Sequence, residues 1–393
     1  MSDEVVKADT SSSVSGVTRA KGIKHSSRSL LKSPWLEISL MAAVLALSYV
    51  AIGLIARGVE TPADGMSAST ILGLLVGFFL LSFAVALVAV LAGIGGGLIF
   101  TPIMLAFTSV DTVIVRATGL IVAMFSGLIS TGPFMRRGLA NLKICLLCLS
   151  VLSVGAFVGA QGAIILAESM GETGDGIVRL SLGIIIFVLV AYFIRGGAHT
   201  EWPEIKRVDR FTKWLNLSQP YYEESLNKVI DYKVTRAGWI LLVMLGVGLV
   251  SGFFGLGGGW AAVPALNLIM GVPLKVAAAC SGVLLGVGSC TGVWPYLLSG
   301  AIIPIFAAPW LIGQVLGGLV GSLLLIRIKA TFVRFILIGL LFFSGFSLVT
   351  KGLSNFGVIG ELPIAVFLTI LALDAAIVFL AITGRLPRLR IRR

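Results

Sequence analysis

A glycine-rich motif that occurs twice constrains this chain more than any other feature. Segment 93–97 reads Gly-Ile-Gly-Gly-Gly and is followed by Pro102, and segment 255–259 reads Gly-Leu-Gly-Gly-Gly and is followed by Pro264. The two motifs lie 162 positions apart, each inside a long apolar run. Because each glycine lowers helix stability by about 1 kcal/mol, three in succession predict that both runs are broken at the motif.

The agreement between the two regions extends beyond the motifs. At the same displacement, small or helix-breaking residues recur without a gap: Val110 with Val272, Ala117 with Ala279, Pro133 with Pro295, Gly138 with Gly300, Gly155 with Gly317 and Gly159 with Gly321. Glycine and proline are the residues that break helices or let them cross closely. We therefore interpret the chain as a doubled unit.

The composition indicates a protein that crosses a membrane many times. Hydrophobic residues make up 57% of the sequence and charged residues 12%, with a mean hydropathy of +1.04. Apolar runs long enough to span a bilayer, roughly 20 residues, cover 36–56, 70–92, 113–134, 144–167, 177–194, 237–256, 276–297, 302–326, 332–350 and 363–383. Shorter apolar pieces, 98–107 and 260–270, follow the two motifs.

The positive charge of the chain is unevenly distributed along it. If the N-terminus is cytoplasmic and every long run crosses, 26 of the 30 Lys and Arg residues fall in inner segments. Such a bias sets the orientation of membrane proteins. We therefore expect a protein of the cell (cytoplasmic) membrane with both termini on the cytoplasmic side. It also explains the net charge of +12 without a nucleic-acid partner.

This orientation predicts that the two copies are inverted. Repeat 1, 70–195, begins outside, whereas repeat 2, 237–350, begins inside. The fold class that we expect is an all-α polytopic membrane protein with two inverted repeats. Each repeat would have a Gly-interrupted hairpin plus three transmembrane helices. The short arm of each hairpin, about 10 residues or roughly 15 Å of helix, covers half a membrane and predicts a re-entrant or broken helix.

The remaining segments complete the expected organisation. Residues 1–35 would form a disordered cytoplasmic tail and 384–393 a basic cytoplasmic tail. Single extra helices, 36–56 and 363–383, would flank the repeats. Residues 196–236 carry aromatic residues among mixed charges, which favours a cytoplasmic interfacial linker with one or two amphipathic helices.

The motifs resemble those of a known family. A G-x-G-G-G core, a downstream proline and a small-residue helix around an Ala-Thr/Ser patch resemble the sulfite exporter TauE/SafE family of membrane permeases over about 75–350. The patch is Ala117-Thr118-Gly119 in one copy and Ala279-Cys280-Ser281 in the other. The resemblance implies export of sulfite, organosulfonates or related small anions. Cys280 stands where the family more usually has threonine.

Two broken segments in corresponding halves indicate a transporter's binding site. Helix N-termini offer unpaired N–H groups and partial positive charge to an anion, and glycines let the backbone approach it. The substrate-binding candidates are Gly95, Gly96, Gly97, Gly257, Gly258, Gly259, Thr101, Thr118, Ser126, Cys280, Ser281, Ser289 and Gln314, with Ser130, Thr131 and Thr291 as further hydroxyls. The competing interpretation is close helix packing, which also enriches small and hydroxyl residues.

Three ionisable residues are candidates for coupling or access. Asp374, in the middle of the last run, would carry a coupling proton, or else form a helix-facing hydrogen bond or an oligomer contact. Arg116, near the outer end of its run, would draw in an anion or extend to the interface. Lys275 is its near counterpart on the inner side.

The sequence argues against an enzyme, a metal site and a bound cofactor. Neither motif completes G-x-G-x-x-G, no G-x-x-x-x-G-K-[ST] is present, and the two histidines lie far apart at His25 and His199. No nucleophile–base constellation lies in the spans. A secondary carrier for a small anion that alternates its access is the leading interpretation, and an anion channel on the same scaffold is the alternative. The exact substrate, the coupling ion and the oligomeric state stay open.

Overall fold

The computed structural model describes residues 68–92, 95–108, 110–136, 138–194, 203, 205, 207–223, 228–324 and 330–360, together with isolated positions in 39–50 and 363–376. The chain divides into two units, 1–54 and 55–393. Only four positions of the first unit are described, and all four are helical. The predicted tails and most of the predicted helices 36–56 and 363–383 lie outside the described residues.

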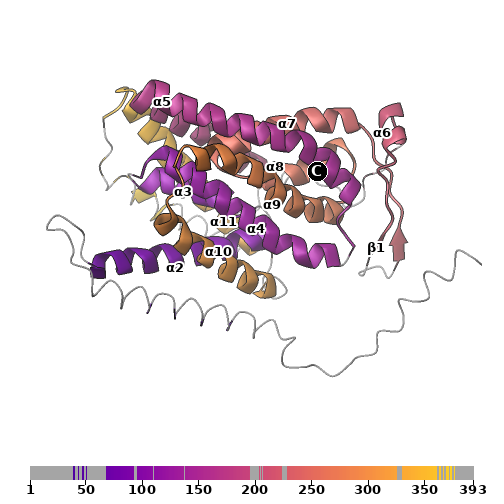
Figure 1. The fold of residues 1–393 in the computed structure, drawn as a ribbon, viewed down its shortest axis with the longest axis horizontal. Helices are drawn as coiled ribbons and strands as arrows, with labels where there is room; N and C mark the ends of the chain where they lie inside the picture. The colour runs from indigo at the N-terminus through magenta and orange to yellow at the C-terminus, as the bar shows by residue number, and fades with distance from the viewer. Residues whose placement is uncertain are drawn as a thin grey trace, which may run out of the picture. The chain divides into compact units, whose positions relative to one another are not determined.

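The described part of the second unit is mostly helical (Figure 1). Its helices are α2 Ala68–Ala92, α3 Gly97–Phe107, α4 Thr112–Arg136, α5 Leu142–Ile194, α6 Arg210–Leu215, α7 Ala237–Phe254, α8 Gly259–Pro264, the π-helix η3 Ala265–Ile269, α9 Leu274–Leu298, α10 Pro304–Leu324 and α11 Ala330–Asn355. Within the described residues, five helices are long and apolar enough to cross a membrane. These lie in α2, α4, α5, α7 and α9, which supports a multi-pass membrane protein.

Both glycine motifs interrupt the helical run that contains them. The backbone leaves the helix after Ala92 and after Phe254, and α3 and α8 begin at the last glycine of each motif. Gly95 has φ +82° and the corresponding Gly257 has φ +72°. Because residues with a Cβ rarely adopt this left-handed conformation, glycine is required at the turn itself.

The two short arms that follow have different helical forms. The first is a continuous α-helix of 11 residues despite Pro102. The second is α8 for six residues and then a π-helix from Ala265 to Ile269, directly after Pro264. Proline removes a backbone donor, and a π-turn is one way in which a helix accommodates the loss.

Helix α5 joins two spans that the sequence separates. It runs for 53 residues, but Gly171 inside it has φ 47° and ψ −124°, which is not helical. The predicted runs 144–167 and 177–194 therefore lie on either side of a kink. The residues between the runs include Gly174, Asp175 and Gly176, which are typical of turns, so α5 consists of two helices that meet at the kink.

Paired helices pack closely through glycine. Helix α5 packs against α7, and α2 against α10, and the members of each pair lie side by side (Figure 1). A Cβ added at Gly155 would meet the backbone oxygen of Leu245, and one added at Gly317 would meet that of Phe83. Gly317 lies 162 positions after Gly155, and Leu245 lies 162 positions after Phe83, so the two contacts are related by the displacement of the motifs. The glycine belongs to α5 in one pair and to α10 in the other.

A third pair, α4 and α9, crosses at glycine on both sides. A Cβ built on Gly127 would lie 2.7 Å from Cα of Gly286, and one built on Gly286 would lie 3.1 Å from N of Leu128. The two backbones therefore touch with no side chain between them, as small residues allow in membrane helices.

The short arms each pack into a buried apolar cluster. The cluster around α8 and η3 includes Leu266 and Met270 with residues of α5, α7 and α9. The cluster around α3 includes Phe100 and Trp310, whose rings lie 4.4 Å apart edge to face. Each short arm is thereby enclosed by longer helices, which satisfies the requirement that irregular backbone at membrane depth be buried in protein.

The segment between α5 and α7 contains a short helix, as expected for one or two helices there, and two strands in addition. It contains the six-residue α6 and an antiparallel ribbon of β1, Tyr221–Glu223, and β2, Lys228–Ile230. The ribbon was not expected from the sequence. Asp209 caps α6 and accepts hydrogen bonds from Thr212, Thr235 and the N–H of Arg236. Burial raises the pKa of Asp209, but these hydrogen bonds outweigh it and hold the pKa at about 2.

Candidate functional site

The first break, at 95–97, and the second break, at 255–259, are the two places where a glycine motif interrupts a helical run. Both breaks lie against the same two side chains. A Cβ built on Gly95 would lie 2.5 Å from Leu285 Cδ2, and one built on Gly257 would lie 2.5 Å from Leu285 Cδ1. Ala123 is shared in the same way, since its Cβ would lie 2.8 Å from a Cβ on Gly97 and 2.5 Å from one on Gly257. The two breaks, which are 162 positions apart in sequence, are therefore separated by only one side chain.

The first break carries polar groups. The N–H of Gly96 donates to Ser126 Oγ over 3.1 Å, and both groups are buried. A Cβ built on Gly96 would lie 2.6 Å from Gln314 Oε1 and would also overlap Nε2. Gln314 is fully buried, and neither polar atom of its amide has a hydrogen-bond partner in the described structure. An unpaired buried amide costs about 1–3 kcal/mol, so this site holds unused hydrogen-bonding capacity.

The second break carries apolar groups at the corresponding positions. A Cβ on Gly258 would lie 3.1 Å from Leu152 Cδ1 and 3.6 Å from Val247 Cγ1. Leu152 stands 162 positions before Gln314, and Gly288 stands in place of Ser126. Leu152 also fills the space that a side chain at position 288 would need. A polar group is also nearby, because Ser289 Oγ lies 3.5 Å from a Cβ on Gly257 and has no hydrogen-bond partner among the described residues.

Residues along one face of α4 contact both breaks. The backbone of Arg116 contacts Gly255, and Gly119 contacts Thr101 and Gly255. Further along are Ala123 and Ser126, as described above. Thr101 Oγ1 donates to the backbone oxygen of Gly255 over 2.9 Å. The Thr101 hydroxyl, which is a substrate-binding candidate, thus joins the short arm after the first break to the turn of the second break.

The other predicted hydroxyls fall into two groups. Ser281, Thr131 and Thr291 donate to backbone oxygens of their own helices, and Thr291 also reaches Ser153 O at 3.2 Å. Thr118 and Ser289 are buried and have no partner in the described residues. The side chain of Ser130 lies outside the described part. The unpaired hydroxyls are therefore the ones with a free proton for a ligand.

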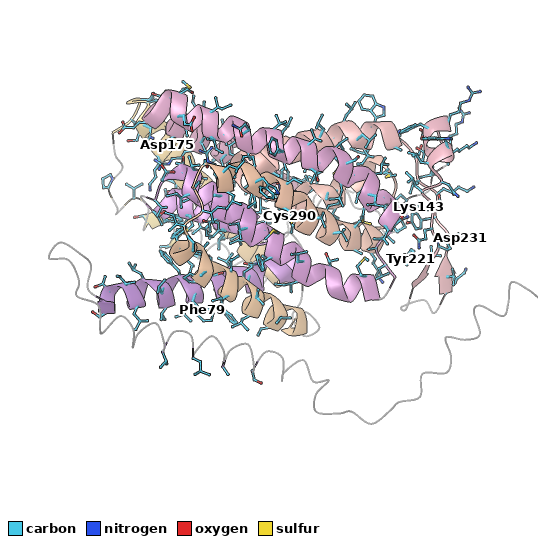
Figure 2. The ribbon with its side chains drawn as sticks, viewed as in Figure 1. Phe79, Lys143, Asp175, Tyr221, Asp231 and Cys290 are labelled. Carbon is cyan, nitrogen blue, oxygen red and sulfur yellow. The ribbon has the colours of Figure 1, made fainter. Side chains whose placement is uncertain are left out.

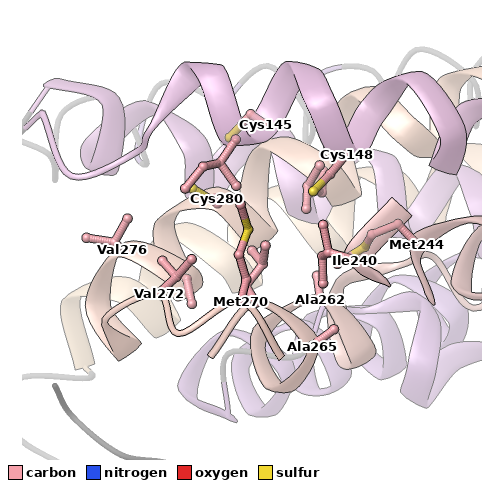
Figure 3. Close-up of a cluster of buried hydrophobic side chains, with 14 of the residues drawn as sticks. Cys145, Cys148, Ile240, Met244, Ala262, Ala265, Met270, Val272, Val276 and Cys280 are labelled. Carbon is pink, nitrogen blue, oxygen red and sulfur yellow. The ribbon is translucent and has the colours of Figure 1, made fainter. Parts of the chain in front are cut away.

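Cys280 lies in an apolar cluster at the beginning of α5. Figure 3 shows it facing Cys145, with Cys148, Met270 and Val276 around it. Its thiol donates to the backbone oxygen of Asn141 over 3.8 Å. Because Cys280 is fully buried among apolar side chains, its surroundings are those of a core residue. The described neighbours of Cys280 are therefore mainly packing residues.

The three candidates for coupling or access lie in different environments. Arg116 is fully buried, in place of the exposed head expected at the outer end of its helix. Lys275 is exposed in the first turn of α9. Asp374 lies outside the described residues.

Two tryptophans near the breaks were not predicted. Trp310, one turn before Gln314 on α10, and Trp260, directly after the second motif, each have a buried indole N–H without a partner among the described residues. Their proximity to the glycines was visible in the sequence for Trp260 alone. For Trp310 only the spacing of four residues to Gln314 gave a signal, and apolar runs contain many such pairs. Within the described residues no cluster of His, Cys, Asp or Glu could hold a metal ion.

The comparisons with known proteins agree with this arrangement. The family model described as sulfite exporter TauE/SafE matches residues 78–348, which include both breaks. The chain belongs to the sulfite exporter TauE/SafE family. A probable membrane transporter protein, YunE of Bacillus subtilis (strain 168), is 24% identical over 273 residues, which cover 67% of this chain and 93% of that protein. No solved structure matches. The family is one of membrane transporters and not a class of enzymes, and this TauE/SafE member is a membrane transporter.

Proposed function

We propose that this chain is a secondary transporter that moves a small sulfur-containing oxyanion, sulfite or an organosulfonate, across the cell membrane by alternating access. The observation that carries the proposal is the first break, where Gly96, Ser126 and the unpaired amide of Gln314 meet in a buried setting. Membership of the sulfite exporter TauE/SafE family supports both the cargo and the outward direction.

The chemistry of the first break fits an oxyanion. The first N–H groups of α3 have no intrahelical acceptor, and the helix dipole adds a partial positive charge at this end. The Gln314 Nε2–H₂ group is a further neutral donor. Neutral donors bind an anion without holding it as firmly as a full charge does, because hydrogen bonds to charged groups contribute only about 1.5–3 kcal/mol each. A carrier needs such a balance, since the substrate must also leave.

The glycines are part of this proposal in two ways. Gly95, Gly96 and Gly97 leave the backbone open to the ligand, and Gly257, Gly258 and Gly259 do the same on the opposing arm. Thr118, Ser281, Ser289 and Cys280 remain proposed contacts, with Ser289 the best placed because it lies beside Gly257. The meeting of both arms at Leu285 supports a single shared site.

Alternating access would come from motion of two inverted repeats. The glycine contacts that repeat at the motif displacement, Gly155 on Leu245 and Gly317 on Phe83, support equivalent helix pairs in the two halves. Rocking of one half on the other would open the shared site to each side in turn. Asp374 is our proposed carrier of a coupling proton.

A flux experiment tests the proposal. Purified protein in liposomes should take up labelled sulfite with saturation, and uptake should fall about a hundredfold in Gly96→Val, since overpacking costs about 1–3 kcal/mol. Gly246→Val is the matched control, because no other atom lies within 4 Å of a Cβ at that position. Absence of uptake of sulfite, sulfoacetate and thiosulfate by folded wild-type protein would reject the cargo. Linear, non-saturating currents would instead identify a channel.

A further inference from the structure

Arg116 carries a buried positive charge with no carboxylate in direct contact among the described residues. It is fully buried, and its Nε donates to Thr112 O over 3.0 Å. Nη2 donates to Thr112 Oγ1 over 3.2 Å. Nη1 is buried and has no hydrogen-bond partner in the described structure. Removing a charge from water without an opposite charge costs several kcal/mol, so this arrangement calls for a function.

The nearest counter-charge is held one hydroxyl away. Thr112 Oγ1 donates to Asp175 Oδ1 over 2.6 Å and accepts from Arg116 Nη2. Thr112 gives its single proton to the carboxylate and accepts from the guanidinium, which only donates, so the hydroxyl lies between the anion and the cation. The link joins the start of α4 to the part of α5 that follows the kink at Gly171.

The remaining surroundings of the guanidinium are neutral. Arg116 Cζ lies 5.8 Å from the centre of the Phe253 ring, a cation–π contact. Tyr296 Oη, in the same buried region, donates to Gly252 O over 2.9 Å. One turn beyond Asp175, Arg179 also has a buried Nε without a partner in the described residues. In the contacts described, the guanidinium therefore meets neutral groups, and the Asp175 carboxylate reaches it through the Thr112 hydroxyl.

This cation is connected directly to the proposed site. The backbone of Arg116 contacts Gly255 in the turn of the second break, and the same face of α4 reaches Ser126 ten residues later. Ten helical residues span about 15 Å. Over such a distance in protein, one charge changes the energy of another by about 1 kcal/mol, which is about a fivefold effect on affinity.

We infer that Arg116 is a second anion subsite of the transport path, for which Asp175 is a built-in competitor. This inference rests on the proposed function and adds a selectivity mechanism to it. An oxyanion that reaches Nη1 during the transport cycle takes the place of Asp175 as the counter-charge of Arg116. The carboxylate keeps the cation stable when no substrate is present, and the Thr112 hydroxyl keeps Nη1 available.

The test uses two substitutions with opposite expected signs. In Arg116→Gln, the KM for labelled sulfite uptake into liposomes should rise about tenfold. In Asp175→Asn, the KM should fall about threefold, because the competing charge is gone. In the double variant, the effect of Asp175→Asn should disappear, since it acts only through the arginine. A purely structural network would give a loss in both single variants.

Controls separate this inference from folding and from the proposed function itself. Arg116→Lys keeps the charge, and its KM should fall between those of wild type and Arg116→Gln. Lys213→Gln removes an exposed positive charge on α6, at the end of the bundle opposite Asp175 (Figures 1 and 2), and should leave the KM unchanged. Thermal unfolding of each variant shows which ones are folded.

The outcomes are distinguishable. If folded wild-type protein transports no anion, the proposed function fails. If wild type transports sulfite and Arg116→Gln does so with the same KM, the subsite is refuted. A rise in KM on Asp175→Asn, or an Arg116→Lys variant as weak as Arg116→Gln, would also overturn it.

Discussion

The two glycine breaks share a backbone and differ in what surrounds it. Gly95 and Gly257 adopt nearly the same left-handed φ, and Leu285 touches both. Yet the amide of Gln314 covers Gly96, whereas the methyl groups of Leu152 cover Gly258. The turn is thus nearly the same at both breaks, while the side chains around it differ. The comparison teaches that two similar backbone breaks can offer different chemistry, and in our proposal recognition falls to the first break.

The largest expected effect tests this assignment with one methyl group. In Gly96→Ala, the added Cβ would overlap the Gln314 amide, and sulfite uptake should fall about a hundredfold at a cost of about 3 kcal/mol. In Gly258→Ala, the Cβ meets only the mobile ends of Leu152 and Val247, and uptake should fall about threefold, an effect below about 1 kcal/mol. Uptake by the two purified variants in liposomes measures the difference. Equal losses would show that the breaks are functionally equivalent.

A substitution that makes the first break resemble the second should have the next largest effect. Gln314→Leu removes both unpaired amide atoms, and the affinity for sulfite should fall about tenfold, as expected for the loss of one hydrogen bond to a charge. Stability should not fall, because an unpaired buried amide is itself unfavourable. Titration of sulfite and thermal unfolding in detergent give the two quantities. Unchanged binding by Gln314→Leu would remove the amide from the site.

Ser126 offers a smaller change at the same break. Ser126→Ala removes the hydroxyl that holds the Gly96 N–H in place and whose own proton can be donated to an anion, and we expect about a fivefold loss in affinity, equivalent to about 1 kcal/mol. Ser150→Ala is the matched control, since Ser150 is exposed and bonds only within its own helix. The same sulfite titration compares the two. A loss of equal size in both variants would indicate a general effect on the helices.

The smallest effect is expected at the second break. Ser289→Ala removes the buried hydroxyl beside Gly257 that has no partner in the described residues. Affinity should fall about twofold, because a neutral hydroxyl at the apolar break contributes well under 1 kcal/mol. Competition binding with wild type resolves a change of this size. A loss greater than that of Ser126→Ala would reverse the ranking of the two breaks.

Much of the helical fold was predictable from the sequence, because membrane helices correspond to continuous apolar runs. The predicted run 113–134 became Thr112–Arg136, and the short piece 98–107 became Gly97–Phe107. Glycine triplets revealed the breaks through helix propensity alone. The ribbon around Tyr221 and Lys228 was missed because its strands have only three residues each, too short for a period of two to emerge.

The site was predictable in kind, and only partly in detail. Gln314 and Ser126 were named as candidates, but the sequence does not show that they meet Gly96 from α10 and α4. Pairing between distant helices depends on packing, which a single sequence does not record. Similarly, Ser281 and Ser289 look alike in sequence, yet one donates to its own helix and the other has no partner in the described part. Arg116 was expected at an exposed position and is instead enclosed, because Thr112 and Phe253 hold its side chain inward.

The crossing of α4 and α9 at Gly127 and Gly286 limits how these two helices can move against each other. Backbones that already touch cannot approach further, and sliding one helix along the other would drive hydrogen atoms into main-chain atoms. Turning about the point of contact changes neither separation nor overlap there, so it is the displacement with the lowest steric resistance. We therefore expect the two helices to rotate about this crossing. A methyl group at either glycine would separate the helices and remove the point of contact.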